Sequence, residues 1–214
     1  NGDATYSDPW LADRAAMLSW VLKANTADTA FAANALYADA PSSLLSGDAW
    51  NFEDRASGLS VLARPQELGN IAPAIRNVVF GAAATDSILG GSVGDRLYGG
   101  AGDDALDGAA ASDYREGNAG NDEIKGGAGT DTLIGGADND TLTGGSGNDR
   151  LEGGRGEDTY VIAAGDGVDT IRDLDGLGSV TLGATTLTGG KKTGTGLYQN
   201  DDKSISYTVS GDLS

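Results

Sequence analysis

The sequence contains no cysteine and no histidine. The absence of cysteine excludes disulfide bonds and thiolate metal sites. The absence of histidine removes the commonest zinc ligand and the commonest general base. A metal ion would therefore have to bind to oxygen atoms, which suit hard cations such as Ca²⁺ or Mg²⁺.

Positive charge is also scarce. The 214 residues include 14 basic and 32 acidic side chains, which gives a net charge of −18. Nucleic acids and anionic membrane surfaces attract positive charge, so neither is an expected partner. No apolar run approaches the roughly 20 residues that a membrane span needs, and no signal peptide opens the chain. The start at Asn1-Gly2-Asp3 is typical of a segment cut from a longer protein.

Glycine and acidic residues share one part of the chain. Residues 1–80 hold only 4 of the 35 glycines, whereas residues 81–161 hold 21. The segment 81–173 carries 19 acidic and 6 basic residues, and the segment 174–214 has a net charge of only −1. We therefore expect three regions, and we expect the function in the central one.

The two flanking regions are predicted to act as caps. In residues 1–80, Asp8 as N-cap and Pro9 at the first position predict a helix that runs to Lys23. Further predicted elements there are a helix over 29–38, a short strand around Trp50 and Phe52, and an apolar run over 78–80. Strands are predicted in the last region over 180–182, 186–187, 197–198 and 204–209, with turns at 189–190 and 201–202.

The central region is a repeat with a period of nine residues. Aspartate recurs at Asp86, Asp95, Asp104, Asp113, Asp122, Asp131, Asp140, Asp149 and Asp158. An apolar residue follows two positions later, at Ile88, Leu97, Leu106, Ile124, Leu133, Leu142, Leu151 and Tyr160. Arg115 is the exception. Glycine opens the units, at Gly81, Gly90, Gly99, Gly108, Gly117, Gly126, Gly135, Gly144 and Gly153.

Units such as GGAGDDALD (99–107) and GGSGNDRLE (144–152) follow the pattern G-G-x-G-x-D-x-U-x, in which U is a large apolar residue. This pattern resembles the RTX (repeats-in-toxin, haemolysin-type) calcium-binding nonapeptide, and the resemblance covers about residues 81–173. It implies a mainly β fold, a right-handed parallel β-roll that holds several Ca²⁺ ions between adjacent loops. The α-rich region 1–80 and the β-rich region 174–214 would then cap the roll.

Two nonapeptides make one coil, so alternate aspartates should stack along opposite edges of the roll. The expected carboxylate ligands are the nine repeat aspartates together with Asp166 and Asp169, which lie in the tail of the array. The expected backbone carbonyl ligands are those of Gly91, Gly100, Gly102, Gly120, Gly127, Gly129, Gly136, Gly145, Gly147, Gly154 and Gly156. The best sites should involve Asp104, Asp122, Asp131, Asp149 and Asp158.

The charges make calcium necessary for folding. Coils about 4.8 Å apart place two stacked carboxylates at a repulsion of roughly 3 kcal/mol. One buried Leu or Ile per unit contributes about 2–3 kcal/mol, whereas ordering nine residues costs on the order of 10 kcal/mol. We therefore predict that residues 81–173 are disordered without Ca²⁺ and fold when the ion binds.

Several units depart from the pattern. Ala84, Val93, Ala111 and Asp138 replace the fourth-position glycine, and a non-glycine residue at positive φ costs roughly 1 kcal/mol. Units 81–89 and 108–116 are therefore expected to bind Ca²⁺ weakly or not at all. Arg115 does not suit an apolar core, so its side chain is expected to leave the core and Tyr114 to compensate.

No catalytic residues are predicted. Ser92 lies in a formal G-x-S-x-G match, but the chain has no histidine to activate it. The segments 13–20 and 50–54 resemble the part that precedes the repeats in some large secreted RTX lipases or esterases, which implies a catalytic domain upstream.

The resemblance implies a role in type I secretion and extracellular folding of a larger bacterial protein. The expected partners are calcium ions, an upstream passenger domain and the type I secretion machinery, and the expected state is a monomer outside the cell. The alternative is a calcium-dependent adhesion or self-assembly module, as in surface layers.

Overall fold

The structure is a computed structural model that describes residues 6–25, 49–63, 74–163, 165–173, 175, 177–182, 185–187, 191–194, 197–199 and 206–208. The helix over 29–38 and the two turns at 189–190 and 201–202, which the sequence predicts, lie outside the described residues. No helix in the described ranges is long and apolar enough to cross a membrane.

One helix and a series of short strands follow one another along the chain. In order they are α1 (Asp8–Asn25), β1 (Ala49–Asp54), β2 (Leu59–Ala63), β3 (Ile75–Phe80), β4 (Ser87–Gly91), β5 (Arg96–Ala101), β6 (Ala105–Ala109), β7 (Tyr114–Ala119), β8 (Glu123–Ala128), β9 (Thr132–Ala137), β10 (Thr141–Ser146), β11 (Arg150–Arg155), β12 (Thr159–Ile162), β13 (Thr170–Arg172), β14 (Ser179–Leu182), β15 (Thr185–Leu187), β16 (Lys191–Gly194), β17 (Leu197–Gln199) and β18 (Ser206–Thr208).

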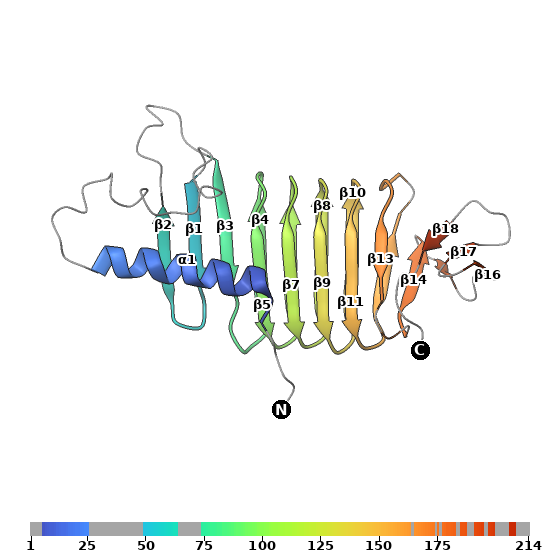
Figure 1. Cartoon of the computed structure of the whole chain (residues 1–214), viewed down its shortest axis with the longest axis horizontal. Coiled ribbons are helices and arrows are strands. Elements are labelled where there is room, and N and C mark those ends of the chain that lie inside the picture. The colour runs from blue at the N-terminus through green and yellow to red at the C-terminus, as the bar shows by residue number, and fades with distance from the viewer. Residues whose placement is uncertain are drawn as a thin grey trace.

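The repeats form a parallel β-roll, as the sequence predicts. Consecutive strands alternate between two sheets, one ordered β13-β11-β9-β7-β5-β3-β1-β2 and the other β15-β14-β12-β10-β8-β6-β4. Within each sheet a strand pairs in parallel with the strand two units further on, so that Leu106 lies opposite Ile124 and Leu133 opposite Leu151. Figure 1 shows the coils stacked along the long axis of the molecule.

The apolar residue of each unit points between the two sheets. Because successive side chains of a strand face opposite ways, the eighth position faces inward while its neighbours face outward. The resulting core contains Val79, Ile88, Leu97, Leu106, Ile124, Leu133, Leu142, Leu151, Tyr160 and Ile171. Leu142 is fully buried, and this degree of burial is worth about 2–3 kcal/mol per residue.

Helix α1 lies across the outer face of the larger sheet, at the end that β2, β1 and β3 form (Figure 1). It begins at Asp8, but its N-cap is Ser7, whose Oγ accepts a hydrogen bond from Trp10 N at 3.1 Å. The prediction of Asp8 as N-cap was therefore wrong by one residue. Met17 of the helix packs with Phe52, Val78, Phe80 and Tyr98 in a second apolar cluster.

Strand β1 contains the predicted strand around Trp50 and Phe52, and β3 contains the apolar run over 78–80. Both pair in parallel and extend the larger sheet beyond the repeats, which the sequence did not indicate. The sequence-predicted strands near the C-terminal end correspond to β14, β15, β17 and β18. Strand β16 was not predicted, and it pairs with β17.

The loops between strands require positive φ at many positions. All of the glycines predicted as carbonyl ligands adopt positive φ except Gly91. Ala111 and Asp138 also have positive φ, at 75° and 78°, so the expected strain applies there. Ala84 and Val93 are not among the positive-φ residues, so the expected strain does not arise in their two loops.

Candidate metal sites along the two edges

The repeat aspartates form two ladders, one along each edge of the roll. The Oδ1 oxygen of Asp122 accepts a hydrogen bond from the backbone N–H of Asp104, which lies 18 residues earlier, at 2.8 Å. The same bond joins Asp131 to Asp113 and Asp140 to Asp122. Since 18 residues are two units, alternate units stack on opposite edges, as the sequence predicts. We call these the even and the odd edge, after the residue numbers of the repeat aspartates on them.

The second oxygen of most of these carboxylates has no partner. Within the described residues, a buried Oδ2 atom without a hydrogen-bond partner occurs at Asp104, Asp122, Asp131, Asp140, Asp149 and Asp158. A buried charged oxygen without a partner costs several kcal/mol unless a cation compensates it. These six side chains include all five that the sequence singles out for the best sites.

Each orphaned oxygen faces a small cradle beside the first glycine of its unit. A Cβ atom added to Gly126 would lie 2.7 Å from Asp131 Oδ2. A Cβ atom added to Gly99 would lie 2.8 Å from the carbonyl oxygen of Gly117, one coil further on. Glycine therefore leaves space where a carboxylate oxygen and a carbonyl oxygen converge. Two oxygen atoms of this kind fit a hard cation.

Burial raises the pKa of the carboxylates in both ladders. It raises the pKa of Asp104 to about 6, that of Asp122 to about 7 and that of Asp140 to about 8. The backbone N–H bond to each Oδ1 opposes this shift, and neighbouring aspartates add to it. A bound cation would favour the charged form of each carboxylate and would lower its pKa again.

Asp86 and Asp95, at the start of the array, are satisfied by protein groups. Asp86 Oδ2 accepts a hydrogen bond from Ala82 N at 2.7 Å, and its Oδ1 lies 3.1 Å from Arg55 Nη1. Asp95 Oδ2 accepts a hydrogen bond from Gly91 N at 2.6 Å, and its Oδ1 accepts one from Asn77 N at 2.5 Å. These two carboxylates have less need of a cation than the six described above.

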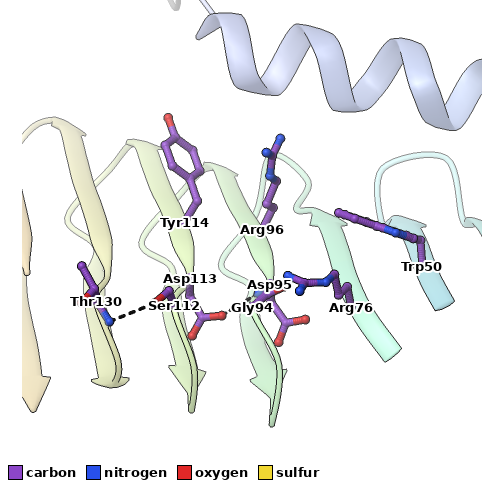
Figure 2. Close-up of a pocket in the computed structure, with 9 residues that line it drawn as sticks. All are labelled: Trp50, Arg76, Gly94, Asp95, Arg96, Ser112, Asp113, Tyr114 and Thr130. Carbon is purple, nitrogen blue, oxygen red and sulfur yellow. Dashed lines mark hydrogen bonds between the residues drawn. The ribbon is translucent and has the colours of Figure 1, made fainter. Parts of the chain in front are cut away.

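Asp95 and Asp113 border a shallow cavity of about 350 Å³. Figure 2 shows the two carboxylates on neighbouring strands, with Arg76 and Trp50 beside them and the hydrogen bond from Thr130 N to Ser112 Oγ on the adjacent coils. Arg76 donates to the Gly94 carbonyl at 3.0 Å and lies over the Trp50 ring. The cavity therefore combines both signs of charge.

Arg115 lies inside the core, contrary to the expectation that it leaves it. Its side chain is fully buried, and it lies opposite Leu97 and Leu133 in the sheet. Nη2 donates to Asp113 Oδ2 at 2.6 Å and to the Gly126 carbonyl at 2.8 Å. Burial lowers the pKa of Arg115, and the surrounding aspartates oppose this shift.

Tyr114 does not compensate for Arg115 in the core. It lies half-buried beside Tyr98 on the outer face, and its hydroxyl donates to Glu116 Oε2 at 3.1 Å. The expectation failed because Nη2 of the guanidinium finds two oxygen partners inside the roll, although its Nε and Nη1 are buried without a hydrogen-bond partner in the described structure. The sequence shows only an arginine at an apolar position.

The array ends with a wider spacing. Asp169 Oδ1 accepts a hydrogen bond from Asp149 N at 3.0 Å, across 20 residues rather than 18. Asp169 therefore continues the odd ladder as its last carboxylate. Asp166 does not, because its Oδ2 accepts a hydrogen bond from Ala163 N at 2.6 Å, within its own loop.

The backbone oxygens near the orphaned carboxylates include some that the sequence reasoning missed. It named carbonyls of the second and fourth positions of the repeat, whereas first-position carbonyls such as those of Gly117 and Gly153 also lie beside the cradles. The first-position glycine is the sequence signal that marks them. The carbonyls of Gly102, Gly127 and Gly136 lie close under the glycines of the next coil.

Among the described residues, no group of three or more His, Cys, Asp or Glu side chains could hold a metal ion by itself. An ion on either edge would therefore take much of its coordination from backbone carbonyls. Calcium accepts such mixed sets of carboxylate and carbonyl oxygens in flexible geometry, whereas Mg²⁺ demands a near-ideal octahedron. The chemistry of the donor set thus fits Ca²⁺.

Comparison with known proteins agrees with this geometry. The sequence profile of the RTX calcium-binding nonapeptide repeat (4 copies) matches residues 80–114, 112–142 and 126–160. No curated protein matches the chain. No solved structure matches it either.

Proposed function

Because residues 80–160 are RTX calcium-binding nonapeptide repeats, we propose that the chain is a calcium-folded module of a larger secreted protein. Several Ca²⁺ ions would bind along the two edges and make folding possible only where calcium is abundant. The module would support type I secretion and extracellular folding of an upstream passenger domain.

The observation that carries this proposal is the set of six buried Oδ2 atoms without a partner. Stacked carboxylates such as Asp122 and Asp140 repel each other by roughly 3 kcal/mol at a spacing of about 4.8 Å. Among the residues that the structure describes, cationic side chains reach only some members of the ladders, as Arg55 does at Asp86. Binding of Ca²⁺ converts this repulsion into ligand charge, so that the binding energy becomes folding energy.

The ligands would come from neighbouring coils. On the even edge, Asp104, Asp122, Asp140 and Asp158 supply carboxylate oxygens, and on the odd edge Asp131, Asp149 and Asp169 do so. Carbonyls of the glycine loops would complete each set. Extracellular calcium modules commonly bind the ion at roughly 10⁻⁴ to 10⁻³ M, a range that would keep the repeats unfolded in a calcium-poor cytosol.

The flanking regions would protect the ends of the roll. Helix α1 and the strands β1–β3 of residues 1–80 cover the first coils through Met17, Phe52 and Phe80. Strands β14 and β15 close the other end of the smaller sheet. Terminal caps of this kind are a general need of solenoid folds, because each coil exposes its apolar interior at the ends of the stack.

The decisive experiment is a Ca²⁺ titration of the chelated chain, followed by far-UV circular dichroism and analytical ultracentrifugation, with Mg²⁺ as control. A gain of β signal with compaction to a monomer, for Ca²⁺ alone, supports the proposal. A chain that is folded in chelator at about pH 8.5, where the ladder carboxylates are charged, or a chain that does not fold at any Ca²⁺ concentration, would overturn it. Calcium-dependent oligomers would instead favour adhesion or self-assembly.

A further inference from the structure

The guanidinium of Arg115 lies beside Gly108 on the odd edge, where the neighbouring coils carry Leu97 and Leu133 at the same position of the repeat. A Cβ atom added to Gly90 would lie 2.7 Å from Asp95 Oδ2 and 2.6 Å from the Gly108 carbonyl. The same atom added to Gly108 would overlap the guanidinium of Arg115. A carboxylate oxygen and a carbonyl oxygen form such a cradle beside Gly90, Gly99 and Gly126, whereas the guanidinium of Arg115 fills it at Gly108.

The oxygen atoms around Arg115 Nη2 are those that line the cradles elsewhere. Asp113 Oδ2, at 2.6 Å, is the sixth-position carboxylate of the same unit. The Gly126 carbonyl, at 2.8 Å, is the first-position carbonyl one coil further on. Asp131 Oδ1, the next carboxylate of the odd ladder, lies 3.7 Å away. One nitrogen atom therefore faces two stacked carboxylates and a backbone carbonyl at once.

The hydrogen bonding along the odd edge changes between Asp113 and Asp131, which we call the Arg115 step. Asp131 and Asp149 each have a buried Oδ2 without a partner in the described structure, whereas that of Asp113 is paired with Arg115. The side chains of Asp113, Asp131 and Arg115, which form these ion pairs, have no solvent exposure. The guanidinium takes up the space beside Gly108 and compensates part of the charge of these two carboxylates, so we do not expect a second cation in the same space.

We propose that Arg115 is a resident cation that replaces one Ca²⁺ ion between Asp113 and Asp131. This inference rests on the proposed function, since it concerns one step of the same calcium array. Calcium then binds along the odd edge only beyond this step, and the coil around Arg115 has part of its negative charge compensated before any ion binds. The coils at this step need no ion between them, and further coils become ordered next to them as calcium binds.

The substitution Arg115→Leu tests this directly, because it restores the apolar residue that the other units carry. The measurement is the number of Ca²⁺ ions bound per chain at saturation, by equilibrium dialysis and isothermal titration calorimetry. We expect one ion more than in the wild-type chain and a higher midpoint of calcium-induced folding. Arg115→Lys, which keeps a positive charge, should retain the wild-type number.

The converse substitution, Leu133→Arg, should remove one ion, because it places a guanidinium beside Asp131, whose Oδ2 has no partner in the described structure. Leu97→Ile, at the same position of the repeat in strand β5 of the same sheet, is the control and should leave the number unchanged. Equal numbers of ions in the wild-type chain, Arg115→Leu and Leu133→Arg would overturn the inference.

Crystals of the wild-type chain grown with Ca²⁺ give a readout that needs no variant. Anomalous scattering should show ions on the odd edge beyond Asp131 and none between Asp113 and Asp131. An ion at that step, with Arg115 displaced, would refute the resident-cation role and leave the calcium module intact. If the wild-type chain binds no Ca²⁺ at all, the proposed function itself fails.

Discussion

Asp140 Oδ1 accepts the backbone N–H of Asp122 at 2.9 Å, while Asp140 Oδ2 is buried without a partner in the described structure. The two oxygens of one carboxylate thus have different structural roles. One holds the preceding coil in register, and the other is available to a cation. The same division applies to Asp104, Asp122, Asp131, Asp149 and Asp158.

The substitution Asp140→Asn distinguishes the effect of the hydrogen bond from the effect of the ligand charge. The new amide side chain would still offer a carbonyl oxygen to Asp122 N, but it would remove one ligand charge. We expect Asp140→Asn to raise the Ca²⁺ concentration at the folding midpoint about tenfold, which corresponds to about 1.4 kcal/mol. Circular dichroism during a Ca²⁺ titration measures this shift. Glu157→Gln removes an exposed charge nearby and should leave the midpoint unchanged, and an equal shift in both variants would contradict the ligand role.

Protonation of the ladder carboxylates should stabilise the ion-free roll and so replace part of the stabilisation that calcium provides. Burial raises the pKa of Asp104 to about 6, that of Asp122 to about 7 and that of Asp140 to about 8, from an ordinary 3.8. The folded, ion-free roll then binds more protons than the unfolded chain, so its stability rises as the pH falls below about 8 and is lost as the pH rises through this range. Circular dichroism in chelator between about pH 8.5 and 4.5 should show β structure appearing on the acid side.

The same shifts predict competition between protons and calcium. Each Ca²⁺ must displace protons from carboxylates that are partly neutral near pH 7, so calcium affinity should fall as the pH falls from about 8 to about 6. Titration calorimetry in buffers of different ionisation enthalpy measures the protons released. The double variant Asp122→Asn/Asp140→Asn should release fewer, and an affinity independent of pH would contradict the raised pKa values.

The core prediction concerns Leu142, which is fully buried between Ile124 and Tyr160 of the adjacent strands. Leu142→Ala should lower the free energy of unfolding by about 2–5 kcal/mol, because it removes buried methyl groups and leaves a cavity. Urea denaturation in saturating Ca²⁺ measures this loss. Leu89→Ala is the control, since Leu89 is 67% exposed and should change stability by less than about 0.5 kcal/mol.

Alanine substitutions at two glycines with similar φ distinguish the cost of backbone strain from the cost of a steric clash with the next coil. Gly145 has φ of 95° and Gly165 has φ of 94°. A Cβ atom at Gly145 would overlap the Gly127 carbonyl oxygen, whereas one at Gly165 would meet nothing within 4 Å. We expect Gly165→Ala to cost about 1 kcal/mol and Gly145→Ala to cost several times more, as measured by thermal unfolding in Ca²⁺. Equal losses would show that coil spacing does not require the glycine.

The resemblance that the repeat units carry predicted the roll, and the nine-residue period then placed the aspartates in two ladders. Leu106 and Leu142 of one sheet and Leu133 of the other share one core, as the single apolar residue in each unit indicates. The same period also located the aspartates whose second oxygen is orphaned. What repeats in the chain could therefore be read without coordinates.

Features that occur once were harder to predict. The contacts of Arg115 depend on Asp113 and on the carbonyl of Gly126, one coil away, and nothing in the local sequence shows that the space beside Gly108 is open. Likewise, the bonds that satisfy Asp86 come from Arg55 and Ala82, and the first of these lies outside the repeat. Periodic patterns carry no information about such pairings.

The direction of the ladder bonds gives the stack a polarity. In each rung the earlier coil supplies the N–H group and the later coil supplies the carboxylate, as in Asp104 to Asp122 and Asp122 to Asp140. A coil that adds at the C-terminal side therefore brings its own anchoring group, and the last coil in place always offers the same free donor. Each added coil is therefore joined by the same bond as the one before it, so the number of coils can change without a change in how any two coils join.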